Sequence, residues 1–269
     1  AKNCLLILLD AFDGARVSHL GYPRETTPHL DAFAARGVSF SNAYSQCSNT
    51  LGSTTSFMTS RYLPAAREAG AAYSMREEDT PLAELFAQSG FAAAAYSENP
   101  FIRPNTGFDR GFHVFQWYPV ILRKRDGEPF RKRDESVTQQ LLRDASTWIT
   151  ANNGKDGWLC YLHILRPHGP YFSPDPFGSK FRPPGTPAPS PSDDLRIMQK
   201  HAYRGYTPTA EEVQLLVDVY DGSLSYVDRL MFEFLEGLRT AGALDDTLIV
   251  FFSDHGEAFL QHGVLGHNT

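Results

Sequence analysis

The chain has 269 residues, and its 25 Lys and Arg against 31 Asp and Glu give a formal net charge of −6. This acidic balance argues against a general nucleic-acid binder, which carries a basic patch or stripe, and 42% hydrophobic residues exclude general disorder. The longest apolar run, Cys4–Leu9, is far shorter than the ~20 residues that cross a bilayer. We therefore expect a soluble globular protein that binds no nucleic acid and makes no membrane contact through this chain itself.

The length predicts one large domain, because single cores stop growing near ~250–300 residues. The chain begins directly in an apolar run and stops at Thr269, inside a Gly- and His-rich segment. We expect residues 1–269 to form a single domain that is truncated at its C-terminus. The sequence predicts neither the oligomeric state nor the compartment of the parent protein, which could be associated with the cell envelope.

Short apolar runs alternate with helical patterns along the chain. The predicted buried strands are Asn3–Leu9, Val38–Tyr44, Phe91–Tyr96, Trp158–Leu165 and Leu248–Ser253. Apolar residues at helical spacing predict helices around residues 30–34, 82–86, 137–148 and 209–241. The last opens with Thr209 and Glu212 at the spacing of a capping box, and Gly222 is a candidate break in it. This alternation predicts an α/β fold with a mostly parallel central sheet and helices on both faces.

Two segments, 118–136 and 173–208, depart from the alternation and are predicted to be surface insertions. The first holds six basic residues between Arg123 and Arg133, which suit either a solvated surface or a rim for anionic substrates. The second is rich in Pro over 181–191, as is typical of an extended surface loop. The three cysteines are too few and too widely spaced for a disulfide framework.

Acidic residues follow the first and the last predicted strands. Asp10 ends the first, and Asp254 with His255 ends the last. Ligands of open parallel sheets bind beyond the carboxyl ends of the strands. If these two strands are neighbours, ~4.8 Å apart, the two carboxylates converge and repel each other unless a cation or proton lies between them. Oxygen and imidazole ligands suit Zn, Mn or Mg. The alternative is that each Asp only caps a helix or turn.

Further histidines lie near the predicted edge of the sheet. His163 alternates with apolar neighbours in a strand, so it is either a site residue or a packed, hydrogen-bonded core residue. His168 follows that strand and precedes Gly-Pro, a loop position suited to a site. His262 and His267 lie in QHGVLGH, where glycines let the backbone approach a small ligand closely; each alone could equally be a surface residue.

The segment 48–62 is unusually rich in hydroxyl side chains. Such residues compete for backbone hydrogen bonds inside a helix, but they suit a helix N-terminus, so we predict that Thr50 and Ser53 form an N-cap pair. The N–H groups of Leu51 and Ser53 would then support an oxyanion. A metal ion could activate a hydroxyl here as a nucleophile. A capped helix without catalytic function is the alternative.

The segments LLILLDAF, TLGSTTSFMTSRYLP, HILRPHGPYFSP and FFSDHGEAFLQHGVLGH follow one another in an order that resembles the sulfatase branch of the alkaline phosphatase superfamily. The resemblance spans nearly the whole chain. It implies an alkaline-phosphatase-like three-layer sandwich, a sulfatase-like catalytic domain, with a metal site at the carboxyl edge of the sheet. It places Asp10, Thr50, Asp254 and His255 on the ligands of a divalent metal ion (Zn, Mn, Mg or Ca), with one ion expected and a second possible.

The same resemblance places Thr50 at the nucleophile position. Formylglycine sulfatases carry Cys or Ser there, within Cys/Ser-x-Pro-x-Arg, whereas this chain has Gly52 and Thr54 at the Pro and Arg positions. Cys47 lacks the pattern too. A Thr nucleophile instead resembles the phosphodiesterases, nucleotide pyrophosphatases and phosphoethanolamine transferases of the superfamily. Ala11 replaces the second Asp of the sulfatase Asp-Asp pair, with Asp13 as the nearby substitute.

These residues lead to the hypothesis of a metal-dependent hydrolase of phosphate esters, mono- or diesters, that acts on a small anionic ester through a phospho-threonine intermediate. The predicted catalytic residues are Thr50, His168 and His267, and those for a second metal or for the substrate are His163, His168 and His267. The alternatives are a sulfuric ester hydrolase, a phosphoethanolamine-type transferase and an inactive, sulfatase-like binding module.

Overall fold

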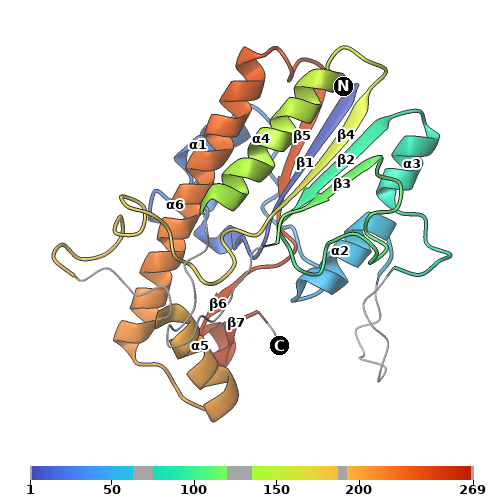
Figure 1. Cartoon of the computed structure of the whole chain (residues 1–269). Coiled ribbons are helices and arrows are strands. Elements are labelled where there is room, and N and C mark those ends of the chain that lie inside the picture. Colours follow the sequence, from blue (N-terminus) through green and yellow to red (C-terminus); the bar gives the residue numbers. More distant parts are fainter. Residues whose placement is uncertain (1, 63–74, 120–134, 187–192, 268–269) are drawn as a thin grey trace.

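The computed structural model describes residues 2–62, 75–119, 135–186 and 193–267. Its centre is a five-stranded sheet in the order β3-β2-β4-β1-β5, in which every neighbouring pair is parallel (Figure 1). The strands are β1 (Asn3–Leu9), β2 (Ala92–Ser97), β3 (Val114–Trp117), β4 (Trp158–Ile164) and β5 (Thr247–Phe252). All five therefore point their carboxyl ends toward the same edge of the sheet.

Helices cover both faces of this sheet, which confirms the predicted three-layer sandwich. The helices are α1 (Pro28–Ala34), α2 (Thr50–Thr59), α3 (Leu82–Gln88), α4 (Glu135–Asn152), α5 (Asp193–Arg204) and α6 (Ala210–Thr240). Leu5, Ile7 and Leu9 of β1 pack with α4 and α6 in one core cluster, and the alternate residues Leu6 and Leu8 pack with α2 and α3 in another. A period of two therefore sends successive β1 side chains into two separate cores.

A smaller unit lies beyond the carboxyl edge of the sheet (Figure 1). It contains a short antiparallel pair, β6 (Ala258–Phe259) and β7 (Leu265–Gly266), and α5. Three short 3-10 helices, η1 (Gly14–Arg16), η2 (Ser18–Leu20) and η3 (Gln261–Gly263), complete the described elements. A third apolar cluster joins this unit to the first half of α6, with Ile197, Leu216, Tyr220 and Phe259 among its buried members. The segment with β6 and β7, the last described part of the chain, is thereby held near the carboxyl edge of the sheet.

One predicted strand is wrong. Residues Val38–Tyr44 form no strand, and the side chains of Val38, Phe40 and Tyr44 are 81%, 79% and 82% exposed. The segment links α1 to α2 and pairs with no strand in the described parts of the chain, so its alternating apolar residues have no sheet to join. Conversely, β3 was not predicted, because four residues are too few for a clear period.

The long helix α6 behaves as predicted at its start and differs at its centre. Thr209 accepts a hydrogen bond from the N–H of Glu212, whose side chain accepts from the N–H of Thr209, so the capping box is confirmed. Gly222 does not break the helix. A Cβ at this position would lie 2.4 Å from the carbonyl oxygen of Phe177, so the missing side chain allows a loop to pack closely on α6.

Most of the predicted first insertion, residues 120–134 and with them its basic side chains, lies outside the described residues. The predicted second insertion, 173–208, contains α5, which the sequence analysis did not identify. Both insertions remain predictions. Cys4 and Cys160 are buried in adjacent strands, as core residues should be. Within the described residues, no helix has the length and apolar character needed to span a bilayer.

Candidate metal and nucleophile site

Two carboxylates and an imidazole meet at the carboxyl edge of the sheet. β1 and β5 are neighbours, with Leu8 opposite Phe252, so Asp10 and Asp254 leave the sheet side by side. Together with His255 they offer three ligand atoms within 4.8 Å of one another, and all three residues are buried. The Nε2 atom of His255 lies 3.6 Å from Asp10 Oδ1 and 3.5 Å from Asp254 Oδ2. The predicted convergence is confirmed.

Each of these carboxylates uses one oxygen for protein contacts. Asp10 Oδ2 accepts a hydrogen bond from Asn99 Nδ2 over 2.7 Å, and Asp254 Oδ1 accepts from the N–H groups of Ala11 and His255. The other two oxygens, Asp10 Oδ1 and Asp254 Oδ2, are buried without a donor among the described residues. Buried acceptors without partners cost about 1–3 kcal/mol each. A divalent cation between them and His255 Nε2 removes that cost, so the donor set fits a metal ion.

The electrostatics of the two aspartates differ. Burial alone raises the pKa of Asp10, but His168, His163 and His255 outweigh it and hold the pKa of this carboxyl well below its usual range. Burial, and next the negative charge of Asp10, raise the pKa of Asp254. This is the pattern of two carboxylates that compete for one positive charge. A cation at this point lets both ionise.

The nitrogen of His255 is prepared for a ligand role. Its Nδ1 lies 3.0 Å from the carbonyl oxygen of Gly256, which can only accept a hydrogen bond, so Nδ1 carries the hydrogen and donates it. In the neutral ring, Nε2 then presents its lone pair toward the two carboxylates. A backbone carbonyl behind the ring is the usual means of fixing the tautomer of a metal-binding histidine.

The hydroxyl of Thr50 belongs to the same cluster. Thr50 is the first residue of α2, is buried, and has its Oγ1 3.4 Å from His255 Nε2. It is not the N-cap, however, so the predicted Thr50–Ser53 cap pair is wrong. Asn49 caps the helix and accepts the N–H of Gly52 over 2.9 Å. Because Asn49 fills the capping role, the Thr50 hydroxyl is left to contact His255.

The first turn of α2 also corrects one predicted oxyanion donor. The N–H of Ser53 donates to the carbonyl of Asn49 as the first bond inside the helix. Its hydroxyl donates to the carbonyl of Cys47. Ser53 therefore does not have the N–H available that the prediction required. The N–H groups at the helix start that precede the first internal bond include those of Thr50 and Leu51.

The structure brings His168 and His267 beside His255. The ring centroids are 4.2 Å apart for His255 and His267, and 4.9 Å apart for His168 and His267. His267 Nδ1 lies 2.9 Å from Oε1 of the buried Glu257. Burial lowers the pKa of His267, but the hydrogen bond and the charge of Glu257 more than compensate and raise it above its usual value. The site therefore contains a second, histidine-rich side.

His163 does not join that histidine side. Its side chain is fully buried, Nδ1 lies 2.8 Å from the Tyr161 hydroxyl, and Nε2 lies 3.3 Å from Asp10 Oδ2. His163 was predicted to bind a second metal or the substrate, and the structure instead engages both of its ring nitrogens inside the core. The alternative of a packed, hydrogen-bonded core residue is correct, and its partner is a predicted metal ligand.

Two other candidates have different surroundings. Asp13 accepts the N–H of Ala15 at the start of η1 and lies 3.8 Å from Arg16 Nε, and its role as a substitute for the second Asp of the sulfatase pair stays a prediction. His262 is exposed in η3. Asn99 and Glu257 were not predicted from the sequence. The rule that found Asp10 applies to Asn99 too, since Asn99 follows the carboxyl end of β2.

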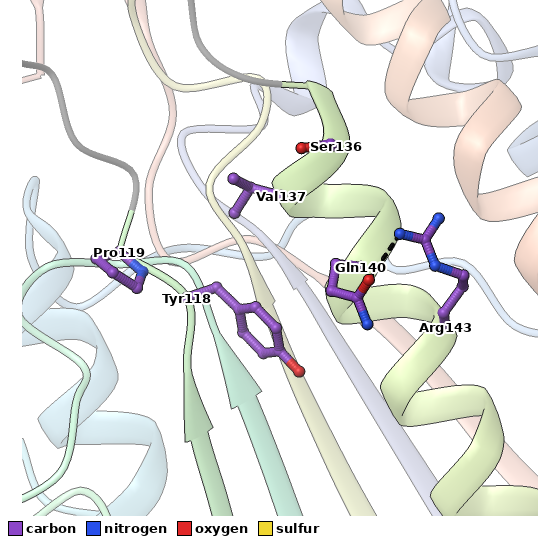
Figure 2. Close-up of a pocket in the computed structure, with 6 residues that line it drawn as sticks. All are labelled: Tyr118, Pro119, Ser136, Val137, Gln140 and Arg143. Carbon is purple, nitrogen blue, oxygen red and sulfur yellow. Dashed lines mark hydrogen bonds between the residues drawn. The ribbon is translucent and has the colours of Figure 1, made fainter.

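A separate surface pocket of about 280 Å³ lies beside α4 (Figure 2). Tyr118 and Pro119 follow β3, and the first turns of α4 supply the other lining residues, Ser136, Val137, Gln140 and Arg143. None of these residues belongs to the metal and nucleophile cluster. We assign this pocket no function.

The fold and this arrangement define an alkaline-phosphatase-like α/β domain. The profile of the Sulfatase family matches residues 2–269, and the chain belongs to that family. It is 23% identical to the choline-sulfatase of Rhizobium meliloti (strain 1021), over 97% of this chain and 59% of that protein. It is 21% identical to arylsulfatase K of Bos taurus, over 97% of this chain and 54% of that protein. The chain thus spans little more than half the length of these curated relatives.

Solved structures show the same fold. The phosphonate monoester hydrolase of Agrobacterium radiobacter superposes with a TM-score of 0.76 at 22% identity, covering 99% of this chain and 65% of that one. The C-terminal periplasmic domain of EcEptC from Escherichia coli, in complex with Zn, gives a TM-score of 0.67 at 20% identity, covering 99% of this chain and 68% of that one.

Proposed function

We propose that the protein is a metal-dependent hydrolase of phosphate esters in which Thr50 is the nucleophile. One observation carries the proposal: the hydroxyl of Thr50 lies 3.4 Å from His255 Nε2, and the same nitrogen lies 3.6 and 3.5 Å from Asp10 Oδ1 and Asp254 Oδ2, two buried carboxylate oxygens that have no donor in the described parts of the chain. Asp10, Asp254, His255 and Thr50 would hold the ion. When bound, a divalent metal ion neutralises the carboxylates and lowers the pKa of a neighbouring hydroxyl.

The steps of the reaction take place at Thr50. Oγ1 of Thr50 loses its proton and forms a bond to phosphorus while the bond from phosphorus to the leaving alcohol oxygen breaks, and that oxygen takes up a proton. Water then attacks the phosphorus of the phospho-threonine and the bond from phosphorus to Oγ1 breaks, so that phosphate leaves after a monoester, or a phosphate monoester after a diester, and Oγ1 takes up a proton to restore the hydroxyl. Thr50 is the first residue of α2, so its Oγ1 lies at the N-terminal end of the helix, 3.4 Å from His255 Nε2.

Charge that develops on the non-bridging oxygens needs nearby donors. The N–H groups of Thr50 and Leu51 lie at the N-terminus of α2, which presents positive potential to an anion. The rings of His168 and His267 lie 6.5 and 4.2 Å from that of His255 and supply further donors. His267, whose pKa is raised by Glu257, also suits proton donation to the leaving alcohol. These two histidines are alternatively ligands of a second ion.

The choice of phosphorus rests on Thr50. A formylglycine sulfatase requires an oxidisable Cys or Ser at the nucleophile position, and this chain has Thr there. Two of the proteins with the same fold are named for phosphorus chemistry, as a phosphonate monoester hydrolase and a phosphoethanolamine transferase. The substrate is a small anionic ester, mono- or diester.

Sulfuric ester hydrolysis is the second candidate, because the curated relatives include a choline-sulfatase and arylsulfatase K. The same metal ligands serve a sulfate oxyanion. An unmodified threonine would, however, form a sulfo-ester that simple hydrolysis releases poorly. A transferase of the phosphoethanolamine type would use the same first step and pass the group to an alcohol instead of water.

The test compares esters on the full-length protein loaded in turn with Zn, Mn, Mg and Ca. Nitrophenyl phosphate, a nitrophenyl phosphodiester and nitrophenyl sulfate are measured with wild type, with Thr50→Ala, and with Thr59→Ala as a matched change at the other end of α2. Phosphoester turnover that disappears only in Thr50→Ala supports the proposal. Turnover of sulfate alone, or an active Thr50→Ala variant, contradicts it.

A further inference from the structure

Asp10 is held by side chains from two other strands. In the order β2-β4-β1, Asn99 follows β2, His163 lies in β4 and Asp10 follows β1. Asn99 Nδ2 and His163 Nε2 both lie at the same carboxylate oxygen, Oδ2, at 2.7 and 3.3 Å. All three side chains are buried. Two donors therefore converge on one oxygen, while Oδ1 has no donor in the described parts of the chain.

The amide of Asn99 is oriented by its own contacts. Its Oδ1 accepts the N–H of Phe101 over 2.8 Å, so the opposite face, Nδ2, is the one that meets Asp10. The backbone is fixed as well, because Trp117 Nε1 donates to the carbonyl of Asn99 and the N–H of Asn99 donates to Ser97 Oγ. Asn99 thus reaches Asp10 from a rigid support at the end of β2.

The ring of His163 is oriented in a similar way. A carboxylate oxygen only accepts, so Nε2 of His163 carries the hydrogen that faces Asp10. In the neutral ring, Nδ1 then accepts from the hydroxyl of Tyr161, 2.8 Å away on the same face of β4. Burial, with the charges of Asp254 and Asp10, raises the pKa of Tyr161 and keeps that hydroxyl protonated. Tyr161 therefore selects the tautomer that donates to Asp10.

We propose that Asn99 and His163, the latter oriented by Tyr161, are positioning residues that hold Asp10 by Oδ2 and so reserve Oδ1 for the metal ion. The inference rests on the metal site of the proposed function. A carboxylate that needed only to be satisfied in the core would have its donors shared between its two oxygens. Here both donors meet one oxygen, and the oxygen without a donor is the one that lies 3.6 Å from His255 Nε2.

The arrangement has a defined chemical effect. Two donors on Oδ2 prevent the carboxylate from rotating and withdraw Oδ2 from the ion, so Asp10 binds through one oxygen in one direction. Contacts of this kind behind a ligand change metal affinity by about 10- to 100-fold when removed. Removing such a contact changes the geometry of the ligand and so lowers metal affinity. A role in positioning can therefore be distinguished from a role in the stability of the fold.

The experiment measures Zn²⁺ affinity by competition with a chromophoric chelator on metal-free full-length protein. Asn99→Ala removes one donor, and Tyr161→Phe removes only a hydroxyl that never contacts Asp10. Tyr118→Phe is the matched control, because its hydroxyl also makes a short bond, 2.6 Å to Asp144, away from the site. We expect Zn²⁺ affinity to fall about 10- to 100-fold in Asn99→Ala and roughly tenfold in Tyr161→Phe, with no change in the control.

A second pair of variants separates positioning from folding. His163→Leu keeps an apolar volume without a donor, whereas His163→Gln retains an amide N–H that can reach Asp10 Oδ2. The glutamine variant should recover affinity relative to the leucine variant, and the visible spectrum of bound Co²⁺ should shift in Tyr161→Phe and not in Tyr118→Phe. Unchanged affinity in Asn99→Ala and Tyr161→Phe overturns the inference alone. A wild type that binds no ion overturns the metal site as well, and one that binds Zn²⁺ but cleaves no ester overturns only the reaction.

Discussion

The hydroxyl of Tyr220 donates to the carbonyl of Ala11 over 2.6 Å, across 209 positions of sequence. The same hydroxyl accepts the N–H of Asp13 over 2.8 Å. It thereby ties the middle of α6 to both sides of the loop that follows Asp10. Ala11 needs this support because its φ of 58° lies in the left-handed region, which a residue with a Cβ adopts at a cost.

Tyr220→Phe should destabilise the protein and loosen the site loop. The change leaves a carbonyl and an N–H unpaired in a buried place, so the free energy of unfolding should fall by about 1–3 kcal/mol. Urea denaturation of wild type and variant measures it. Tyr206→Phe is the control, since its hydroxyl bonds Glu212 near the surface, and it should have little effect. Equal stability of Tyr220→Phe and wild type would contradict the role given to this hydroxyl.

Asp254→Asn should make the metal-free protein more stable and abolish its stabilisation by metal. The amide oxygen can still accept from Ala11 and His255, while the amide N–H₂ replaces the carboxylate oxygen that has no donor in the described residues and removes the repulsion with Asp10. An ion that binds only the folded state raises the unfolding temperature with concentration.

Differential scanning fluorimetry with and without Zn²⁺ checks both effects of Asp254→Asn. Wild type and the surface control Asp245→Asn should show a Zn²⁺-dependent rise in unfolding temperature that EDTA reverses. A rise of equal size in Asp254→Asn would remove Asp254 from the ligands.

Gly52→Ala should be destabilising at the start of α2. A Cβ there would lie 2.4 Å from Cys47 Sγ and 2.8 Å from Cys47 Cβ, closer than real contacts allow. Overpacking of this kind costs about 1–3 kcal/mol. The second change Cys47→Gly, which deletes both clashing atoms, should restore part of the stability.

The matched control for Gly52→Ala is a substitution that should change the stability in the opposite direction. Gly237 is an exposed glycine inside α6 whose added Cβ would meet nothing within 4 Å. Gly237→Ala should therefore stabilise the protein by about 0.5–1 kcal/mol through helix propensity. If both substitutions shift the unfolding midpoint in the same direction, the close packing of Gly52 does not govern its effect.

Tyr22 should contribute to loss of stability at high pH. Burial, followed by the hydrogen bond to Asp221 and the charge of Asp221, raises the pKa of Tyr22 to about 12, above the value of about 10 of an unfolded tyrosine. The folded state thus holds the proton more tightly, so the contribution is full below pH of about 10 and is lost as pH rises to about 12. Tyr22→Phe should flatten the fall in stability over that window, as measured by denaturation at several pH values. Tyr62→Phe, at an exposed position, should leave the slope as in wild type.

The sequence predicted that Asp10, Asp254 and His255 come together better than it predicted their surroundings, for physical reasons. Asp10 and Asp254 could be found because parallel strands bring their carboxyl ends to one edge. The register of β1 with β5 then places the two residues side by side. The segment Ser48-Asn49-Thr50 offers three adjacent capping residues, and composition does not say which one caps. The structure selects Asn49 and so leaves Thr50 to the site.

Other features depend on contacts that no local pattern encodes. Val38–Tyr44 alternates like a strand, yet strand formation requires a partner, and the described sheet ends at β5. Asn99 is an ordinary polar residue after a strand, and its importance follows only from the place of β2 two strands away from β1. His163 shows the reverse, since its alternation with apolar residues correctly indicated burial.

The strand order has a consequence for how the protein is made. β1 emerges first from the ribosome but lies between β4 and β5, which come from the middle and the end of the described chain. Such distant parallel pairings fold slowly, because long stretches of chain must be ordered before they form. Asp10 is therefore synthesised well before Asp254 and His255. A nascent chain that lacks β5 offers an ion only part of the proposed ligands. Metal uptake would then follow the addition of β5 to the other described strands.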